Sequence, residues 1–448
     1  MAKQQMMRLN RATELQGEKT MGYVDSWYAR TLSDATDYPT LEGEREADVC
    51  IIGAGLAGLT AASELARAGK RVIVLEAERI GWGASGRNGG FVSPGYAASL
   101  SLISLYAGAE RAKALYRLSI EGADMVRGNV DALDVRDACK PVHGKIGVMR
   151  HPARDALMQR RDQLARDFGY EVAYMPRDDV RAVLRSDKYF DALHDPQAFH
   201  FHPLNYARAL ARDIIAHGGA IFENSAVIGA VLDAPEKRLR TIGGSVRARD
   251  VVLAGGGYTT DLVPELRRAY LPIATYVLLT EPAPERIAQA VTSPCAISDN
   301  RRANDYYRLV DDGRRLLWGG RITTRRAEPR DLAALLRKTM VSTYPQLSDL
   351  RVEIAWSGLM SYARHLMPQI GRLREGVYYC TAFGGHGLNT TAIGGRVVAE
   401  AITGESDRIR LFEPFGLAWN GGPFGTAAVQ LTYWTYQAQD WWKERRAA

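Results

Sequence analysis

The chain has 448 residues, of which 46% are apolar and 24% charged, as in an ordinary globular protein with room for two domains. Its formal net charge is +7, but only ten of its 58 basic residues are lysine and no run of five or more basic residues occurs, so we expect no nucleic-acid binding. The four cysteines form no C-x-x-C pair and predict neither disulfides nor zinc. No transmembrane segment or secretory signal is recognisable, and we expect a cytoplasmic protein, at most peripheral at the inner face of the membrane.

Residues 1–45 are predicted to form a polar N-terminal arm, in which SWYARTL favours a short docking helix. The stretch ADVCIIGAGLAGLTAASELARAGKRVIVLEAERI then indicates a strand, a tight turn, an alanine-rich helix and a second strand. The helix is expected to end near Gly69.

The turn of this unit carries the motif Gly53-Ala54-Gly55-Leu56-Ala57-Gly58, and Glu76 follows at the end of the second strand. In this context G-x-G-x-x-G predicts a dinucleotide site, with the pyrophosphate at the helix N-terminus. Gly53 would permit the turn, Gly55 the approach of the pyrophosphate, and Gly58 close helix–strand packing. Glu76 would accept hydrogen bonds from the ribose hydroxyls, and either NAD or FAD fits this unit.

The next segment, GWGASGRNGGFV at 81–92, has five glycines within ten residues. Glycine is favoured where backbone must approach another group closely, and we expect this loop to run along a cofactor. A nicotinamide enzyme would normally continue into further βα units, so the loop favours FAD with its bulky flavin ring.

Later segments alternate between helices and strands. Residues 96–190 are predicted to be mainly helical, 202–232 to form a helix followed by strands, and RARDVVLAGGGY to be a strand entering three glycines. Residues 271–281 and 306–321 are predicted strands, the second with a DDG hairpin turn, and 328–344 a helix. Residues 377–402 repeat the order of strand, glycine loop and helix.

Several of these motifs together resemble a known family. The N-terminal unit, the GASGRNGG loop and the late GGHG loop are similar to FAD-dependent oxidoreductases of the D-amino-acid oxidase and glycine oxidase family. SWYARTL, YYRL…LLWGGR and WSGLMSYARHLMPQIG resemble its gamma-glutamylputrescine oxidase branch most closely. The likeness runs from about residue 25 to 405.

The resemblance implies an α/β fold with a discontinuous, Rossmann-like FAD-binding domain and an α+β substrate domain built on a mixed sheet. We expect 1–45 as the arm, 46–95, 196–262 and 352–405 as the FAD-binding domain, 96–195 and 263–351 as the substrate domain, and 406–448 as a helical extension.

The resemblance also extends the cofactor site from the first motif to later segments of the chain. Beyond the residues of the turn and Glu76, it implies FAD contacts from Ala77, Arg79, Gly83, Ala84, Ser85, Arg87, Asn88, Gly89, Gly90, Val227, Ala254, Gly255, Gly358, Gly384, Gly385, His386, Gly387 and Leu388. The stretch SYARHLMPQIG lacks the cysteine through which some relatives bind flavin covalently, so we expect noncovalent FAD.

The implied activity is oxidation of an amine or amino acid. Hydride would pass to flavin N5, the resulting imine would hydrolyse, and electrons would continue to O₂ or a quinone. Substrate-side candidates are Tyr307, Arg308, Arg321, Trp356 and His365. In the strand Asn304–Leu309, Tyr307 and Leu309 share one face, and Tyr306 and Arg308 share the other, but the pattern does not say which face meets the flavin.

Each of these candidates also has a structural interpretation. Arg308 and Arg321 are equally compatible with solvated or internally paired strand residues, and a hydrogen-bonded structural role suits His365 better than a catalytic one. His200 and His202 in HFHP resemble a turn of the family and predict no metal site.

The last segment, GTAAVQLTYWTYQAQDWWKERR, places Leu431, Trp434, Ala438 and Trp441 on one helical stripe. We expect it to dock on the protein itself or on a second subunit. The alternative is a peripheral membrane helix that delivers electrons to quinone. An NAD(P)-linked dehydrogenase, a flavin monooxygenase and a non-enzymatic flavoprotein are the other functions left open.

Overall fold

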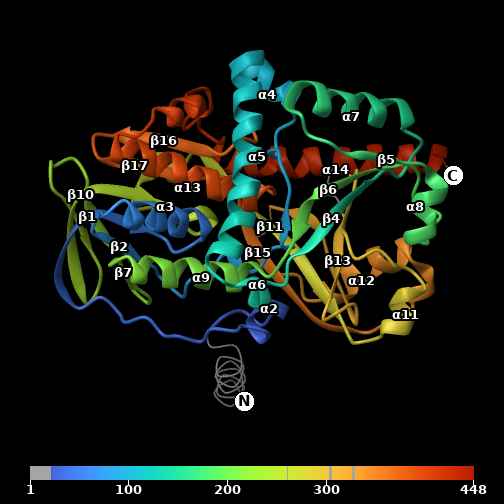
Figure 1. Ribbon diagram of the computed structural model, residues 1–448, viewed down its shortest axis with the longest axis horizontal. Coiled ribbons are helices and arrows are strands. Elements are labelled where there is room, and N and C mark those ends of the chain that lie inside the picture. Colours follow the sequence, from blue (N-terminus) through green and yellow to red (C-terminus); the bar gives the residue numbers. More distant parts are fainter. Residues whose placement is uncertain (1–21, 260, 302–304, 325–327, 448) are drawn as a thin grey trace.

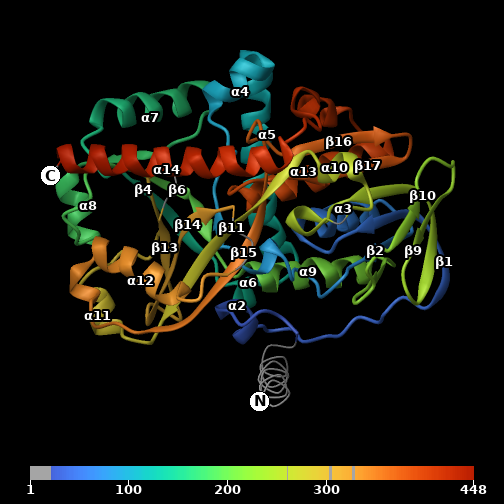
Figure 2. The same cartoon turned by 180° about the vertical axis from the view of Figure 1, so that it is seen from behind.

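The computed structural model describes residues 22–259, 261–301, 305–324 and 328–447, and these form two β-sheets that lie side by side (Figure 1). The long helix α5 (Ala109–Ala132) runs between the two halves. Seen from behind, the same division is clear, with β1 and β10 at one end and α8 and α11 at the other (Figure 2). The chain crosses between the halves several times, so neither sheet is continuous in sequence.

The first sheet has a parallel centre. Its order is β16-β17-β10-β1-β2-β7, with β9 paired to β10 and β8 to β9. Strand β2 is buried along its whole length, as expected for a parallel strand covered on both faces. The strands are β1 (Gly43–Ile52), β2 (Val72–Leu75), β7 (Ala220–Phe222), β8 (Gly229–Val231), β9 (Lys237–Arg240), β10 (Gly244–Leu253), β16 (Gln369–Arg374) and β17 (Val377–Thr381).

Three helices pack on this sheet; α3 and α13 follow the predicted order of strand, glycine loop and helix, and α9 is the helix predicted within 202–232. Helix α3 contacts β2, α9 contacts β7, and α13 contacts β17 and α3. Alanines make up much of α3, and nearly all of its residues are buried. The helices are α3 (Leu56–Arg67), α9 (Pro203–Ala216) and α13 (Gly387–Thr403).

The second sheet is mixed and has nine strands in the order β15-β11-β14-β13-β12-β4-β6-β3, with β5 paired to β6. Its longest pairing joins β11 and β15 antiparallel along nearly their whole lengths. The strands are β3 (Phe91–Val92), β4 (Val142–Val148), β5 (Ala173–Met175), β6 (Ala192–His200), β11 (Tyr270–Thr280), β12 (Ala296–Asp299), β13 (Tyr306–Val310), β14 (Arg315–Thr323) and β15 (Val352–Ala363).

The remaining helices belong to both halves of the molecule. The expected docking helix in SWYARTL is α2, where Ser26 caps the first turn and Tyr28 is fully buried. The remaining helices are α2 (Trp27–Arg30), α4 (Leu100–Ala107), α6 (Arg136–Cys139), α7 (Arg154–Phe168), α8 (Arg177–Val183), α10 (Pro264–Arg267), α11 (Pro284–Ala288), α12 (Leu332–Thr343) and α14 (Gly422–Ala447). Four 3-10 turns are η1 (Ala84–Gly86), η2 (Gly256–Tyr258), η3 (Pro345–Leu347) and η4 (Arg408–Phe415).

Two segments expected in the FAD-binding domain contain strands of the second sheet. Residues 352–405 were expected in the FAD-binding domain, but the segment begins with β15, which pairs with β11 of the second sheet. Strand β3, at 91–92, also pairs with the second sheet, through β6. The division of the chain into domains stays a prediction.

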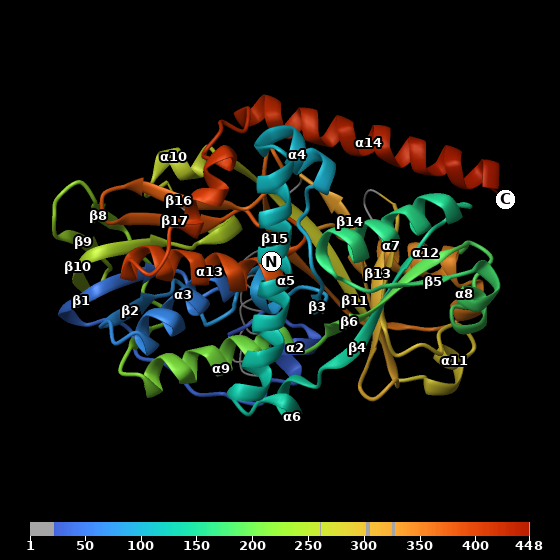
Figure 3. The ribbon, with the colours of Figure 1, turned by 45° about the horizontal axis from the view of Figure 1, so that its top comes forward.

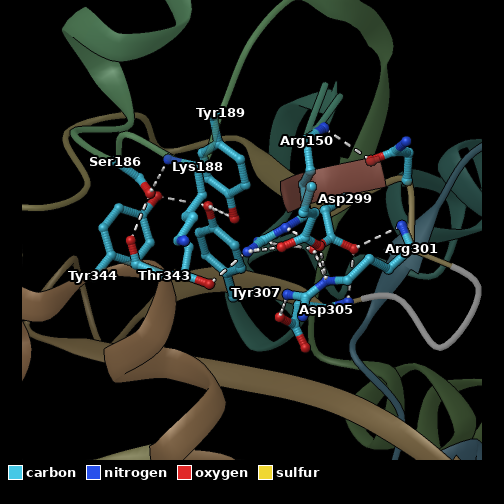
Figure 4. A network of polar contacts seen from close by, with 12 residues as sticks. Arg150, Ser186, Lys188, Tyr189, Asp299, Arg301, Asp305, Tyr307, Thr343 and Tyr344 are labelled. Atoms are coloured by element: carbon cyan, nitrogen blue, oxygen red, sulfur yellow. Dashed lines mark hydrogen bonds and ion pairs between the residues drawn. The ribbon is translucent and has the colours of Figure 1, made fainter. Parts of the chain in front are cut away.

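The C-terminal helix α14 lies across the outer surface of the half that contains the second sheet (Figure 3). Near its end, Glu444 accepts a hydrogen bond at 2.8 Å from Nε of Arg150. Arg150 also contacts Asp299, and Asp299 accepts a bond from Arg301 at 2.9 Å (Figure 4). This buried ionic network fastens the helix to β12. No helix in the part of the chain that the structure describes is long and apolar enough to cross a membrane.

Candidate active site

The turn between β1 and α3 is built for close packing of backbone. Gly53 has a φ of +105°, and a Cβ there would lie 2.8 Å from the carbonyl oxygen of Ala254 at the end of β10. A Cβ at Gly58 would lie 2.0 Å from the carbonyl oxygen of Gly53. Both positions therefore require glycine. The amide of Leu56 at the start of α3 donates to Ser85 Oγ at 2.9 Å, so the 81–90 loop meets the helix N-terminus, where an anion is favoured.

Glu76 stands directly after β2 and holds the same turn. Its carboxylate accepts hydrogen bonds from the backbone N–H of Ala54 at 2.6 Å and of Glu78 at 3.0 Å. Burial raises the pKa of this carboxyl, and the two backbone N–H groups oppose that shift. The side chain also lines the adjoining cavity. Its contact with the ribose of a cofactor stays a prediction.

Arg87 is a buried cation in the 81–90 loop. Its Nε donates to the carbonyl oxygen of Trp82 at 2.7 Å, and its guanidinium lies 4.0 Å from the centre of the Trp82 ring. Nη2 is buried and has no hydrogen-bond partner among the described residues. Burial lowers the pKa of this guanidinium. A buried guanidinium with a free donor on a cavity wall fits an anionic group such as a pyrophosphate.

A cavity of about 630 Å³ connects this turn with the second sheet. Its volume lies in the usual range for a ligand site. The glycines, the free donor of Arg87 and the helix N-terminus all suit a dinucleotide. The cofactor residues predicted from the sequence that line the cavity are Gly53, Gly55, Leu56, Ala57, Glu76, Ala77, Gly83, Ala84, Ser85, Arg87, Asn88, Gly89, Val227, Ala254, Gly255, Gly358, Gly384, Gly385, His386, Gly387 and Leu388.

Three predicted cofactor residues lie behind this wall. Gly58 packs inside the turn, Arg79 pairs with Glu223 at 2.9 Å, and a Cβ at Gly90 would meet the carbonyl oxygen of Phe201 at 2.4 Å. Their packing explains their residue types without a ligand. Direct contact of these three with a cofactor stays a prediction.

The predicted substrate residues that the structure describes also lie outside the cavity wall. Tyr307 is fully buried, stacks on Trp318, and shares hydrogen bonds with the hydroxyls of Tyr189 at 3.0 Å and Tyr344 at 2.7 Å (Figure 4). Arg308 donates to Nδ1 of His200 at 2.8 Å and to the carbonyl oxygen of Phe201 at 3.0 Å. These contacts favour the structural interpretation of both residues.

Trp356 and His365 have structural contacts as well. Nε1 of Trp356 donates to the carbonyl oxygen of Arg87 at 3.0 Å, which fixes the loop from β15. His365 accepts a bond from the backbone N–H of Met367 at 3.2 Å, and burial lowers its pKa. The backbone of Arg321 belongs to β14, while its side chain and Asn304 lie outside the described part of the structure. The catalytic roles of all five candidates stay predictions.

The face of β13 that meets the cavity carries Tyr306, which was not among the predicted site residues. Its ring fits between two glycines: a Cβ at Gly89 would lie 2.7 Å from it, and one at Gly319 would lie 2.1 Å from it. The nearest neighbour of Gly89 is therefore this ring, whereas the resemblance implied a contact of Gly89 with FAD. Lys145, Tyr258, Met360 and Tyr362 also line the cavity and were not predicted.

His386 precedes α13 and lines the cavity as expected from the GGHG loop. Its Nε2 donates to the carbonyl oxygen of Ser93 at 2.9 Å. Burial, and then the charge of Lys145, lower its pKa to about 4, so the ring is neutral near pH 7. The described residues contain no group of three or more metal-ligating side chains.

Comparison with known proteins places the chain in a family. The family model "FAD dependent oxidoreductase" (DAO) matches residues 48–401, and the chain belongs to this family. It is therefore an oxidoreductase that uses FAD, as the GASGRNGG loop suggested. The expected fold class is confirmed, since the same fold occurs in glycine oxidase and in L-proline dehydrogenase.

Two curated relatives are similar over most of their length. Gamma-glutamylputrescine oxidoreductase of Escherichia coli K12 is 33% identical, with 87% of this chain and 91% of that protein aligned. Probable oxidoreductase OrdL of Haemophilus influenzae is 32% identical over the same shares. Among solved structures, glycine oxidase of Geobacillus kaustophilus has a TM-score of 0.69 at 20% identity, covering 83% of this chain and 98% of that one.

The packing of Gly58 predicts that Gly58→Ala loses FAD. The added methyl group would collide with the carbonyl oxygen of Gly53 and open the turn, which we expect to weaken FAD binding at least about tenfold. The measurement is the flavin content of the purified protein. Gly128→Ala in α5 is the matched control, because a Cβ there meets open space. This variant should retain FAD, and its free energy of unfolding should rise by about 0.5–1 kcal/mol. Full flavin content in Gly58→Ala would contradict this account.

The buried histidines predict destabilisation in mild acid. Burial, aided by the charge of Arg308, lowers the pKa of His200 and of His202 to about 3, and that of His386 is also low. Because these folded-state pKa values lie below the ordinary value of about 6.5, their contribution to stability is complete above pH ~6.5 and decreases as the pH falls. Between neutral pH and pH ~5, each of these histidines should lower the free energy of unfolding by about 2 kcal/mol.

Urea unfolding at neutral pH and in mild acid measures this loss. His200→Gln should make stability less dependent on pH, even if it lowers stability overall. His143→Gln, at an exposed position, is the control and should leave the dependence unchanged. An equal slope in wild type and His200→Gln would refute the assignment.

Proposed function

We propose that the chain oxidises the C–N bond of an amine or amino acid. The observation that carries the proposal is the cavity, which joins the FAD-type turn to a wall of tyrosine and methionine side chains on the second sheet. The names of the relatives support it, since one is a gamma-glutamylputrescine oxidoreductase and another a glycine oxidase. Bound FAD supplies the acceptor for two electrons.

The chain's own residues favour a neutral amine in this part of the cavity. Tyr306, Met360 and Tyr362 form a largely apolar wall that excludes water. The only described acidic side chains lining the cavity are Glu76 and Glu78, beside the dinucleotide turn. An ammonium group at the second sheet would lose hydration without gaining a carboxylate partner, so its pKa falls and its proton passes to solvent. The neutral nitrogen can then donate its lone pair.

We also propose that substrate contacts come from Tyr306, Met360 and Tyr362 on β13 and β15. Thr275 stands beside Tyr306 on the same wall and contacts it through its side chain. FAD is held noncovalently in this proposal. In its support, none of the four cysteines, all of which the structure describes, lines the cavity. Acid precipitation should then release the flavin into the supernatant.

Anaerobic flavin reduction tests the proposed activity. The purified holoprotein is mixed without oxygen with a panel of primary amines, secondary amines and amino acids. At least one class should bleach the visible flavin absorption, and admission of O₂ or of a soluble quinone then identifies the electron acceptor. Bleaching by NADH or NADPH alone, with no response to any amine, would overturn the proposal.

The outer face of α14 supports a second proposal, that the enzyme rests on an anionic lipid surface. Leu431, Trp434 and Trp441 each expose more than half of their surface. Trp442 also exposes about half of its surface, and the guanidinium of Arg446 lies 4.7 Å from the centre of its ring. Tryptophan beside arginine suits the boundary between lipid headgroups and acyl chains. Electrons would then have access to a quinone in the membrane.

Vesicle flotation tests this contact. The protein should float with phosphatidylglycerol vesicles and remain behind with phosphatidylcholine vesicles. Trp434→Ser combined with Trp441→Ser should abolish flotation while flavin content is unchanged. Trp419→Ser, at an exposed position before the helix, is the control. Flotation of the double variant, or a helix-dependent dimer in light scattering with no flotation, would exclude lipid as the occupant.

A further inference from the structure

One charged side chain stands alone at the end of the cavity formed by the second sheet. The second sheet and Ser93, which follows β3, contribute several residues to the cavity wall. Of those that the structure describes, Lys145 is the only one with a formal charge. It lies on β4, and its strand pairs with β12 on one side and β6 on the other. The register places Lys145 and Ser298 on the same face, and Ser298 is paired with Tyr306 on β13. Lys145, Ser298 and Tyr306 thus lie on three successive strands that line the cavity.

The ammonium of Lys145 is incompletely satisfied by the protein. Its Nζ contacts Ser93 Oγ at 3.1 Å, and none of the described carboxylates forms an ion pair with it. An ammonium has three N–H donors, so further donors are available toward the cavity. Burial lowers the pKa of Lys145, while the more distant charge of Asp195 opposes that shift.

The neighbouring groups are committed to other partners. Asp195, opposite Lys145 on β6, accepts a hydrogen bond from the hydroxyl of Tyr170 at 2.9 Å and one from the backbone N–H of Ala198 at 3.0 Å. His386 donates its Nε2 proton to the carbonyl oxygen of Ser93 and is neutral. Asp195 acts on Lys145 only from beyond ion-pair distance and His386 is neutral, so neither forms the direct ion pair that a cation in a partly desolvated position favours.

We propose that Lys145 is a specificity-determining residue that binds a carboxylate of the substrate. The substrate class is then an amine that carries a carboxylate, which deepens, and rests on, the amine oxidation proposed above. The carboxylate would accept hydrogen bonds from the free donors of Nζ and one from the Ser298 hydroxyl. The substrate amine would lie along the tyrosine wall, where no described side chain bears a charge. The two ends of the substrate are thereby distinguished by charge.

Carboxylate binding to the FAD holoenzyme tests this assignment. Glutarate is the probe and glutaramide its uncharged counterpart, and binding is read from the change in the visible flavin spectrum and from calorimetry. Lys145→Met should weaken the binding of glutarate at least about 30-fold, as expected for loss of a charge pair, and should leave the affinity for glutaramide unchanged. Lys145→Arg should retain most of the glutarate affinity. Lys140→Met, at a largely exposed lysine, is the matched control.

Flavin content and thermal unfolding show whether each variant is folded, and the test relies on the ratio between the two probes within one variant. Equal affinity of wild type and Lys145→Met for glutarate would overturn the proposal. A Lys145→Met variant that binds glutarate normally and is slow only in reacting with O₂ would also overturn it.

Substrate kinetics separate this inference from the proposed function. If γ-aminobutyrate and butylamine both reduce the flavin, Lys145→Met should raise KM for γ-aminobutyrate and leave KM for butylamine unchanged. Comparison with glycine shows whether the carboxylate lies beside the reacting carbon or at the far end. If no amine reduces the flavin but glutarate binding depends on Lys145, the amine activity fails and the carboxylate site stands. If amines reduce the flavin and both KM values are unaffected, the Lys145 assignment fails alone.

Discussion

The contact between the β1–α3 turn and the end of β10 is the constraint on which the site depends. Gly53 must approach the carbonyl oxygen of Ala254, and Gly58 must approach that of Gly53, so the helix N-terminus is held directly above two parallel strands. The carboxylate of Glu76 holds the same turn from β2 by accepting the N–H of Ala54. Three strand ends and a helix start are thereby brought together at the cavity, and the N-terminus of a helix is a position that favours an anion.

The 81–90 loop connects this turn with the second sheet through direct contacts. Ser85 contacts the start of α3, Trp356 of β15 holds the carbonyl oxygen of Arg87, and Gly89 admits the ring of Tyr306 from β13. The loop is therefore rich in glycine because it packs between two sheets as well as beside a cavity. This packing explains how one short segment aligns a dinucleotide crevice with a substrate wall.

The local parts of the site could be predicted from the sequence, and the long-range parts could not. Gly53, Gly55 and Glu76 follow a spacing set within one βαβ unit, and the structure brings them together as expected. Tyr306 was missed in favour of Tyr307 because alternation gives two faces, and only pairing with β12 and β14 decides which one meets the cavity. Alternation from Gly358 along β15 would have indicated Met360 and Tyr362. Lys145 carried no local signal, since its place in the cavity depends on β4 lying between β12 and β6.

The charges of the cavity provide a physical link between cofactor, substrate and chemistry. Arg87 is a buried cation without a carboxylate partner, and Lys145, at the second sheet, has none within ion-pair range among the described residues. Both cations favour anions and oppose the protonated form of a substrate amine. The field that would hold a pyrophosphate and a carboxylate therefore also favours the neutral amine from which electrons can be withdrawn. Binding and activation then have the same electrostatic cause, and a carboxylate base placed beside the amine would oppose both by stabilising the ammonium form.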